Sequence, residues 1–142
     1  MNHWYEKYTD IPYKLFGSDP QKGMDCFTLL CHVFKTELNI TIPYTSSDFL
    51  KIVDDRWFLK THEQFFLNEM KKGDWVEISS LEPFDLILMC LGSTNVANHV
   101  AMYVGNNKIL QMLENRPSGI YDYHKYFQQY TIKKARWKNL KN

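Results

Sequence analysis

Cysteine is scarce in this 142-residue sequence, which contains only Cys26, Cys31 and Cys90 and no Cys-x-x-Cys pair. An odd number of scattered cysteines does not form a disulfide framework, so at least one thiol is expected to be free. Glycine and proline are also few, with six and five residues. The sequence has no internal repeat, low-complexity stretch or linker. We therefore expect a single domain over residues 1–142.

Neither sign of charge is in excess, because the net charge is +1 and 23% of the residues are charged. This balance argues against a disordered chain and against a strongly basic nucleic-acid-binding protein. The basic residues within 133–138 are interpreted as a solvated strand end. Hydrophobic residues make up 44% of the chain, which is enough to build a sizeable core.

Long apolar runs are missing as well. None is long enough to span a membrane, and the first seven residues lack the apolar centre of a signal peptide. We expect a protein made in a cytoplasm and not inserted into a membrane. If it works outside a cell, something other than the ordinary secretion signal takes it there.

Helical patterns occupy the first half of the chain. Residues 25–38 carry apolar side chains near helical spacing, and Asp25 stands where an N-cap is expected. Two further helices are expected, one that begins at residues 46–48 and one over residues 61–72. Residues 44–82 show no chemical signature, and they are expected to form cleft walls or a partner surface.

Strand patterns occupy the second half. Residues 84–91 form a nearly continuous apolar run, typical of a strand covered on both faces. Residues 99–104 and 108–113 flank a turn at 105–107, which indicates a β-hairpin. Residues 130–137 are a last strand. Helices followed by an antiparallel sheet predict an α+β domain.

Cys26 lies at the beginning of the expected helix over residues 25–38. Backbone N–H groups there have no intrahelical partner, and the helix dipole favours negative charge. This position is expected to shift the thiol toward the thiolate, which attacks carbonyl groups. The same N–H groups can stabilise the oxyanion of a tetrahedral intermediate. The alternative is that Cys26 is a small buried apolar residue, the interpretation given to Cys31 and Cys90.

His99 opens the first strand of the hairpin. A three-residue turn at 105–107 would place Gln111 diagonal to His99 on the same face, about 7–8 Å away at Cα. Gln111 would then hydrogen-bond one ring nitrogen and leave the other for the Cys26 thiol. Ala101, being small, would leave room for the helix that carries Cys26. A two-residue turn would instead place Gln111 on the other face.

Three segments resemble the NlpC-type cell-wall peptidases. Residues 23–29 (GMDCFTL) resemble their nucleophile motif G-x-D-C-S-G-L, and residues 82–87 (EPFDLI) resemble their P-G-D-L-V strand. Residues 98–108 resemble the H-V-G-I-Y-x-G segment. The family's third polar residue lies twelve positions after the histidine, at Gln111. Tyr13 resembles a tyrosine that lines the substrate cleft.

The resemblance implies a papain-like fold, with N-terminal helices packed on a small antiparallel sheet, and cleavage of stem-peptide bonds in peptidoglycan. It assigns catalytic roles to Cys26, His99 and Gln111. Asp25 would bind the free amine of the stem peptide, although it fits a helix cap equally well. Tyr13 would contact the substrate. No metal or cofactor is expected.

Three departures from the family pattern affect substrate choice and rate. Phe27 and Thr28 replace the Ser-Gly pair after the nucleophile, which changes the cleft wall. Phe84 replaces the usual glycine of the strand motif. Gln111 replaces the commoner histidine and is a neutral orienting group.

A narrower resemblance is to the tail-tip assembly proteins of lambda-type phages. It rests on Asp25-Cys26 followed by an aromatic, a hydroxyl residue and leucine, on Asn98-His99 in a strand, and on residues 113–130. It implies phage tail-tip proteins as partners and a location in the virion, or in the host cytoplasm during assembly. Two alternatives stay open: a structural tail protein that keeps an unused cleft, and an amidase or acyltransferase on the same fold.

Overall fold

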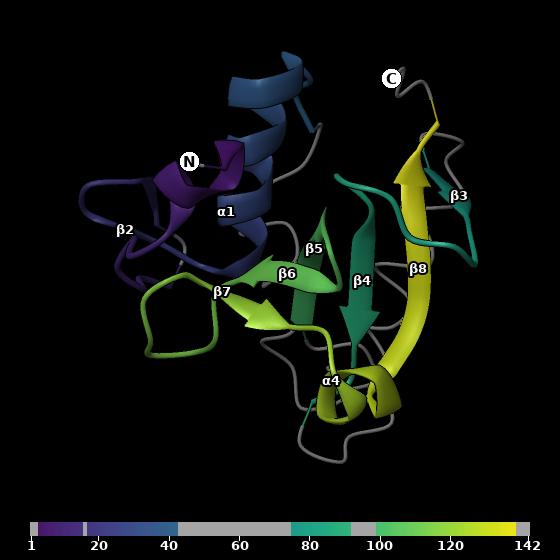
Figure 1. The fold of residues 1–142 in the computed structure, drawn as a ribbon. Coiled ribbons are helices and arrows are strands. Elements are labelled where there is room, and N and C mark those ends of the chain that lie inside the picture. Colours follow the sequence, from purple (N-terminus) through teal and green to yellow (C-terminus); the bar gives the residue numbers. More distant parts are fainter. Residues whose placement is uncertain (1–2, 16, 43–74, 92–98, 139–142) are drawn as a thin grey trace, which may run out of the picture.

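The computed structural model describes residues 3–15, 17–42, 75–91 and 99–138. A six-stranded antiparallel sheet has the strand order β3-β8-β4-β5-β6-β7, and the helical N-terminal part lies against one of its faces (Figure 1). The expected helices at 46–48 and 61–72 lie outside the described residues. The elements are η1 (Trp4–Tyr8), β1 (Ser18–Asp19), β2 (Gly23–Met24), α1 (Cys26–Val33), the π-helical η2 (Phe34–Leu38), β3 (Trp75–Glu77), β4 (Leu86–Met89), β5 (His99–Gly105), β6 (Lys108–Gln111), β7 (Gly119–Asp122), α4 (Lys125–Gln129) and β8 (Thr131–Trp137).

The first long helix begins with a reciprocal cap. The Asp25 carboxylate accepts hydrogen bonds from the N–H groups of Phe27 and Thr28 at 3.0 and 2.9 Å. The Thr28 hydroxyl in turn accepts the Asp25 N–H at 2.9 Å. The helix continues from α1 into η2 and ends at Asn39, whose φ of +55° is left-handed. The helix predicted over residues 25–38 is therefore confirmed, with a π-helical last part.

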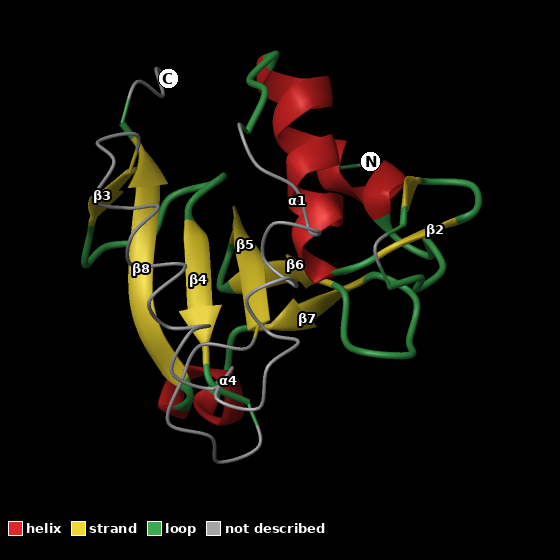
Figure 2. Ribbon diagram, turned by 180° about the vertical axis from the view of Figure 1, so that it is seen from behind, coloured by secondary structure: helices red, strands yellow, loops and turns green. Residues whose placement is uncertain are grey.

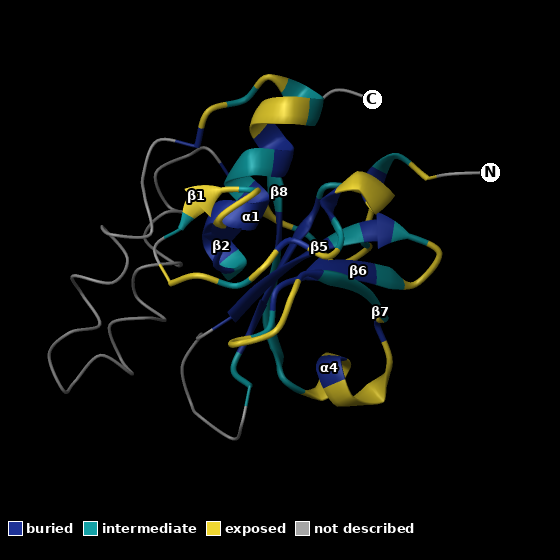
Figure 3. Cartoon of the chain, turned by 90° about the vertical axis from the view of Figure 1, so that its left-hand side faces the viewer, coloured by how far each residue is buried: buried dark blue, intermediate teal, exposed yellow. Residues whose placement is uncertain are grey.

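Strand β4 lies at the centre of the sheet and is buried on both faces. Leu86 and Leu88 point into the core that α1 covers, while Ile87 and Met89 point into a second core with Phe127 of α4. Figure 2 shows α1 and α4 as separate helices beside the sheet. In Figure 3 burial is concentrated in the central strands and α1, whereas turns, β1 and much of α4 are exposed. The prediction of a strand covered on both faces is confirmed.

A buried carboxylate joins the start of β4 to β8. The side chain of Asp85 is fully buried, and Arg136 donates to its two oxygens, each at 2.8 Å. The N–H of Glu82 donates to the same carboxylate at 2.7 Å. This paired geometry offsets the cost of burying the charge, and it fixes the turn that leads into β4.

Phe84 shortens the strand predicted over 84–91. Its φ of +78° is left-handed and lies within a turn in which the Asp85 N–H donates to the Glu82 carbonyl at 3.0 Å. The ring stacks on Trp4 with centroids 4.6 Å apart. A non-glycine residue is disfavoured in this conformation. The aromatic contact with η1 therefore accompanies a backbone strain that a glycine would avoid.

Several short elements were not predicted from the sequence, namely η1, β3, β7 and α4. None exceeds five residues, so none repeats a helical or strand period often enough to be recognised. Within the described residues, no helix is long and apolar enough to cross a membrane.

Replacing Phe84 separates the stacking of its ring on Trp4 from the left-handed strain of its backbone. We expect Phe84→Ala and Phe84→Gly both to lower the free energy of unfolding, because both lose the stacking on Trp4. The glycine variant should be more stable than the alanine variant by about 1 kcal/mol, because glycine removes the left-handed strain. Denaturant unfolding monitored by fluorescence measures the difference. A glycine variant less stable than the alanine variant would contradict the role of φ.

Candidate active site

His99 and Gln111 meet at the end of the β5–β6 hairpin. His99 is the first residue of β5 and Gln111 the last of β6. His99 Nε2 lies 2.8 Å from Gln111 Oε1, and the residues are 5% and 0% exposed. An amide oxygen only accepts, so Nε2 carries the proton and Nδ1 is left as an acceptor. The hydrogen bond predicted from the sequence is confirmed.

The turn that produces this pairing differs from the predicted one. Gly105 pairs with Lys108, so the loop contains only Asn106 and Asn107, with φ of +51° and +59°. The prediction of a three-residue turn is therefore wrong. A register shift between Tyr103 and Gly105 then absorbs one residue. This bulge keeps Gln111 on the same face as His99 despite the two-residue loop.

The small side chain of Ala101 was expected to leave room for the helix that carries Cys26. This prediction is wrong, because the helix does not lie over Ala101. Val100 and Met102 face α1, whereas Ala101 belongs to the core beside α4. Cys26 reaches the start of β5 instead. The backbone groups of Val100 and of Cys26 itself lie close enough to the sulfur to favour its thiolate, against the larger effect of burial on the thiol pKa. The nucleophile candidate therefore lies one residue from His99 along β5.

Burial dominates the electrostatics of Cys26. Cys26 is of intermediate exposure as a residue, but desolvation of its sulfur and the negative charge of Asp25 raise the pKa of the thiol to about 12. The backbone groups of Val100 and Cys26 oppose this rise and do not overcome it. The expected shift toward thiolate is therefore wrong for the site without substrate.

Burial also keeps His99 uncharged. It lowers the pKa of the His99 imidazole to about 4, and the hydrogen bond with Gln111 acts in the opposite direction. At neutral pH the two groups are therefore a neutral thiol and a neutral imidazole. Such a pair transfers its proton as the sulfur attacks, with the imidazole as general base.

The structure gives Asp25 and Tyr13 different positions around the thiol. Asp25 is 5% exposed and caps α1. Tyr13 forms a β-bridge with Met24, two residues before Cys26. Burial raises the pKa of the Tyr13 phenol, and the nearby acidic groups of Glu114, Asp25 and Cys26 add to the rise. Tyr13 thus stays protonated beside the thiol and can donate a hydrogen bond.

Glu114 is a neighbour of the site that the sequence analysis missed. It is exposed and lies three residues after Gln111. Its charge contributes to raising the pKa of both Tyr13 and Cys26, so it lies near both groups. The only signal in the sequence was its place in the stretch 113–130, which marks no particular residue.

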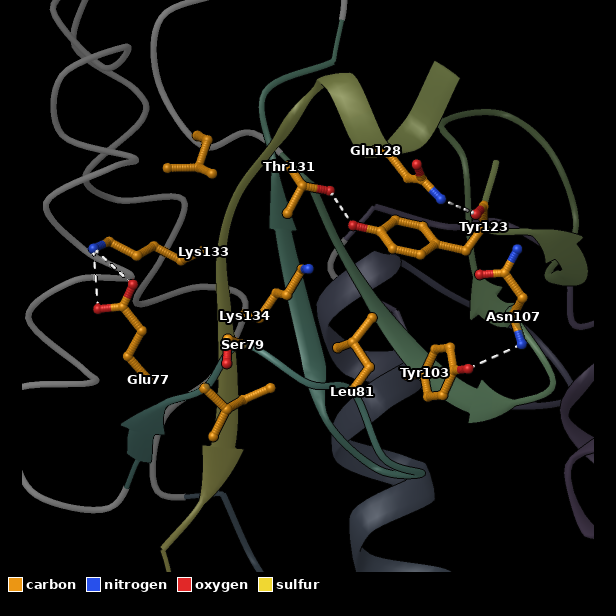
Figure 4. Close-up of a pocket in the computed structure, with 12 residues that line it drawn as sticks. Glu77, Ser79, Leu81, Tyr103, Asn107, Tyr123, Gln128, Thr131, Lys133 and Lys134 are labelled. Carbon is orange, nitrogen blue, oxygen red and sulfur yellow. Dashed lines mark hydrogen bonds and ion pairs between the residues drawn. The ribbon is translucent and has the colours of Figure 1, made fainter. Parts of the chain in front are cut away.

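A separate hollow of about 540 Å³ lies on the α4 side of the sheet (Figure 4). In it Lys133 pairs with Glu77 at 3.2 Å, and the hydroxyls of Tyr123 and Thr131 lie 2.6 Å apart. None of the five site residues predicted from the sequence lines this hollow. Among the described parts of the chain, no three His, Cys, Asp or Glu side chains come close enough to hold a metal ion.

The sequence is similar to proteins of known activity. The NlpC/P60 family model matches residues 10–136. The murein DD-endopeptidase MepH of Escherichia coli (strain K12) is 30% identical over 100 residues, which are 70% of this chain and 30% of that protein. The gamma-DL-glutamyl hydrolase of Bacillus subtilis (strain 168) is 24% identical over 106 residues, 75% of this chain and 21% of that protein. The chain spans less than a third of each relative.

Solved structures show the same fold. The NlpC/p60 domain of the peptidoglycan hydrolase SagA superposes with a TM-score of 0.57 and 18% identity, covering 92% of this chain and 90% of that one. NlpC1 from Trichomonas vaginalis gives a TM-score of 0.63 and 22% identity, covering 91% and 40% of the two chains. The prediction of a papain-like α+β fold is confirmed.

The neutral thiol–imidazole pair predicts how Cys26 reacts without substrate. We expect its alkylation by iodoacetamide to rise continuously from pH 5 to about pH 9, because the thiolate fraction increases tenfold per pH unit below the thiol pKa. Peptide mass spectrometry measures labelling at each cysteine, and Cys26→Ala gives the background from Cys31 and Cys90. A rate plateau below pH 7 would show a thiolate–imidazolium pair and contradict the prediction.

Proposed function

Because the chain belongs to the NlpC/P60 family, we propose that it is a cysteine peptidase that cleaves peptide bonds in the stem peptides of bacterial peptidoglycan. The observation that carries the proposal is the buried His99–Gln111 pair at 2.8 Å. The backbone of Val100, the next residue of the same strand, acts on the pKa of the Cys26 thiol and so lies close to it. The murein endopeptidase and the gamma-glutamyl hydrolase among its relatives support an amide substrate.

The proposed reaction is acyl transfer through Cys26. As the sulfur attacks the carbonyl carbon, its proton passes to Nδ1 of His99, and backbone N–H groups near Cys26 stabilise the oxyanion. The imidazolium then protonates the leaving amine, and the C–N bond breaks to leave a thioester. His99 next takes a proton from water, which attacks the thioester and releases the acid and the thiol. Gln111 keeps the proton on Nε2 throughout. This scheme requires no metal or cofactor.

The acidic surroundings of Cys26 support a substrate with a free amine. Asp25 and Glu114 both oppose the thiolate by their charge. An ammonium group bound between them would offset this repulsion and lower the pKa of the thiol. We therefore propose that Asp25 and Tyr13 line the position of the stem-peptide amine, in addition to the role of Asp25 as a helix cap. A substrate of this kind would favour ionisation of the nucleophile that attacks it.

Cleavage by the wild-type protein and its loss in Cys26→Ala test the proposal. We expect purified muropeptides to yield shorter stem peptides and one new amine per cut. Cys26→Ala should lower the rate by about a thousandfold or more, because the nucleophile is removed. Cys31→Ala and Cys90→Ala are matched controls and should retain activity. If wild type releases no new amine from muropeptides, the peptidase proposal fails, and cleavage of other amides would favour the amidase alternative.

Variants at Gln111 test its role toward His99. We expect Gln111→Leu to lower kcat about tenfold or more, because Nε2 of His99 loses the acceptor that fixes its tautomer. Gln111→His supplies a ring nitrogen as the acceptor in place of the amide oxygen, and it should retain more activity than Gln111→Leu. Thermal unfolding of both variants provides the control for folding. Equal kcat values for Gln111→Leu and wild type would remove Gln111 from the catalytic set.

We further propose that the protein acts with phage tail-tip proteins, in the virion or in the host cytoplasm during assembly. The support is the sequence resemblance around Asp25-Cys26, at Asn98-His99 and over residues 113–130. A phage carrying Cys26→Ala should assemble tails but deliver DNA poorly into hosts with an intact wall. Equal infection by mutant and wild-type virions would favour the alternative of a structural tail protein with an unused cleft.

A further inference from the structure

Ser118 connects two distant segments with four hydrogen bonds. It is 2% exposed. Its N–H donates to the Ile11 carbonyl at 2.9 Å, and its carbonyl accepts the Asp10 N–H at 2.9 Å. Its hydroxyl accepts the Ile11 N–H at 2.9 Å and donates to the Tyr8 carbonyl at 2.6 Å. We call this set the Ser118 clamp. The hydroxyl both accepts and donates a hydrogen bond, so its removal leaves the buried Ile11 N–H and Tyr8 carbonyl without this partner.

One side of the clamp leads to the nucleophile. The segment that Ser118 holds runs on to Tyr13, whose two neighbours bond the backbone of Met24. The Met24 N–H donates to the Pro12 carbonyl at 2.9 Å, and the Lys14 N–H donates to the Met24 carbonyl at 2.9 Å. Met24 lies two residues before Cys26. The clamp therefore fixes the strip of backbone that carries Tyr13 beside the thiol.

The other side of the clamp leads to the base. Ser118 ends the loop 112–118, which joins β6 to β7 above the pair Gln111 and Gly119. Within this loop the Arg116 N–H donates to the Leu113 carbonyl at 3.1 Å, so Glu114 occupies an outer corner of the turn. The loop is thus anchored at Gln111 by the sheet and at Ser118 by the clamp. Between these anchors lies Glu114, which is exposed and whose charge acts on both Tyr13 and Cys26.

We propose that Ser118 is a positioning residue that sets the width of the substrate cleft, by holding the strip with Tyr13 against the loop with Glu114. This inference rests on the proposed function. Cys26 and His99 depend less on the clamp, because the core residues of α1 pack directly on β5. Loss of the clamp should therefore weaken substrate binding more than it slows the chemical step.

Ser118→Ala separates an effect on substrate binding from an effect on the chemical step. The probe is the synthetic stem tripeptide L-Ala-γ-D-Glu-meso-diaminopimelate, with hydrolysis followed by release of amine. We expect KM to rise about fivefold or more and kcat to stay within about twofold, because uniform binding is lost and transition-state contacts remain. Alkylation of Cys26 by iodoacetamide should be unchanged. Amide hydrogen exchange at Ile11 should be faster, which shows directly that the clamp has opened.

Two further variants serve as controls. Thr9→Ala removes a hydroxyl from the same segment, one that bonds only the nearby Glu6 carbonyl at 2.7 Å, and should leave KM unchanged. Ser118→Thr keeps the hydroxyl and should keep KM near the wild-type value. If Ser118→Ala does not melt cooperatively, Ser118→Cys replaces it with the same criterion, because a thiol is a weaker donor and acceptor.

The outcomes distinguish failure of the clamp from failure of the proposed function. If Ile11 exchanges faster in Ser118→Ala while KM stays within about twofold of wild type, the clamp does not position the cleft. A fall in kcat with KM unchanged overturns it as well. If the wild-type protein does not cleave the tripeptide, the cleavage proposal fails for this bond. The clamp is then judged by calorimetric dissociation constants of the tripeptide, and an unchanged constant or no wild-type binding overturns it.

Discussion

The backbone hydrogen bonds between β5 and β6 decide which side chains share a face, and the contact between His99 and Gln111 depends on them. Because side chains alternate along a strand, a shift by one residue would turn Gln111 away from His99. Two local features set the register together, the two-residue loop of Asn106 and Asn107 and the bulge that precedes it. Either feature alone would place Gln111 on the face of the sheet that packs against α1, opposite the face of Ala101 and Ile109. Together they return it to His99 at 2.8 Å.

The same burial that orders the site also keeps it uncharged. A thiol and an imidazole enclosed by α1 and the sheet lose the water that would stabilise thiolate and imidazolium. The N–H groups at the start of α1 and in β5 offset part of that loss. The Gln111 side-chain nitrogen has no hydrogen-bond partner among the described residues, so the hydrogen bond of its side-chain oxygen to His99 is the one the amide makes with them. The arrangement favours a base whose orientation is fixed and whose charge develops only during the reaction.

Much of the fold was predictable because long elements repeat their pattern. The helix after Asp25 and the hairpin around Asn106 and Asn107 carry strong local signals, and the cap at Asp25 is formed by residues within one turn. The catalytic candidates followed from those elements once they were joined by the family's spacing. The role of Asp25 as a cap is confirmed, while its contact with substrate stays a prediction.

Other features depend on contacts that the local pattern does not contain. The bulge before the turn and the face on which α1 packs are set by the whole sheet, so the turn length and the role of Ala101 were predicted wrongly. The left-handed Phe84 depends on Trp4, eighty residues earlier in the chain. The raised pKa of Cys26 depends on how much water the assembled core excludes. The proximity of Glu114 to Tyr13 and Cys26 depends on the path of the loop between β6 and β7.

The links between Ser118 and the N-terminal segment have a consequence for the order of events during synthesis. The Ser118 hydroxyl hydrogen-bonds the backbone of Ile11 and of Tyr8, which lie 107 and 110 positions earlier in the chain. The segment bearing Tyr13 therefore lacks the Ser118 anchor until residue 118 has left the ribosome. A chain truncated before residue 118, or still growing toward it, would carry Cys26 without the hydrogen bonds that hold the Tyr13 segment in place.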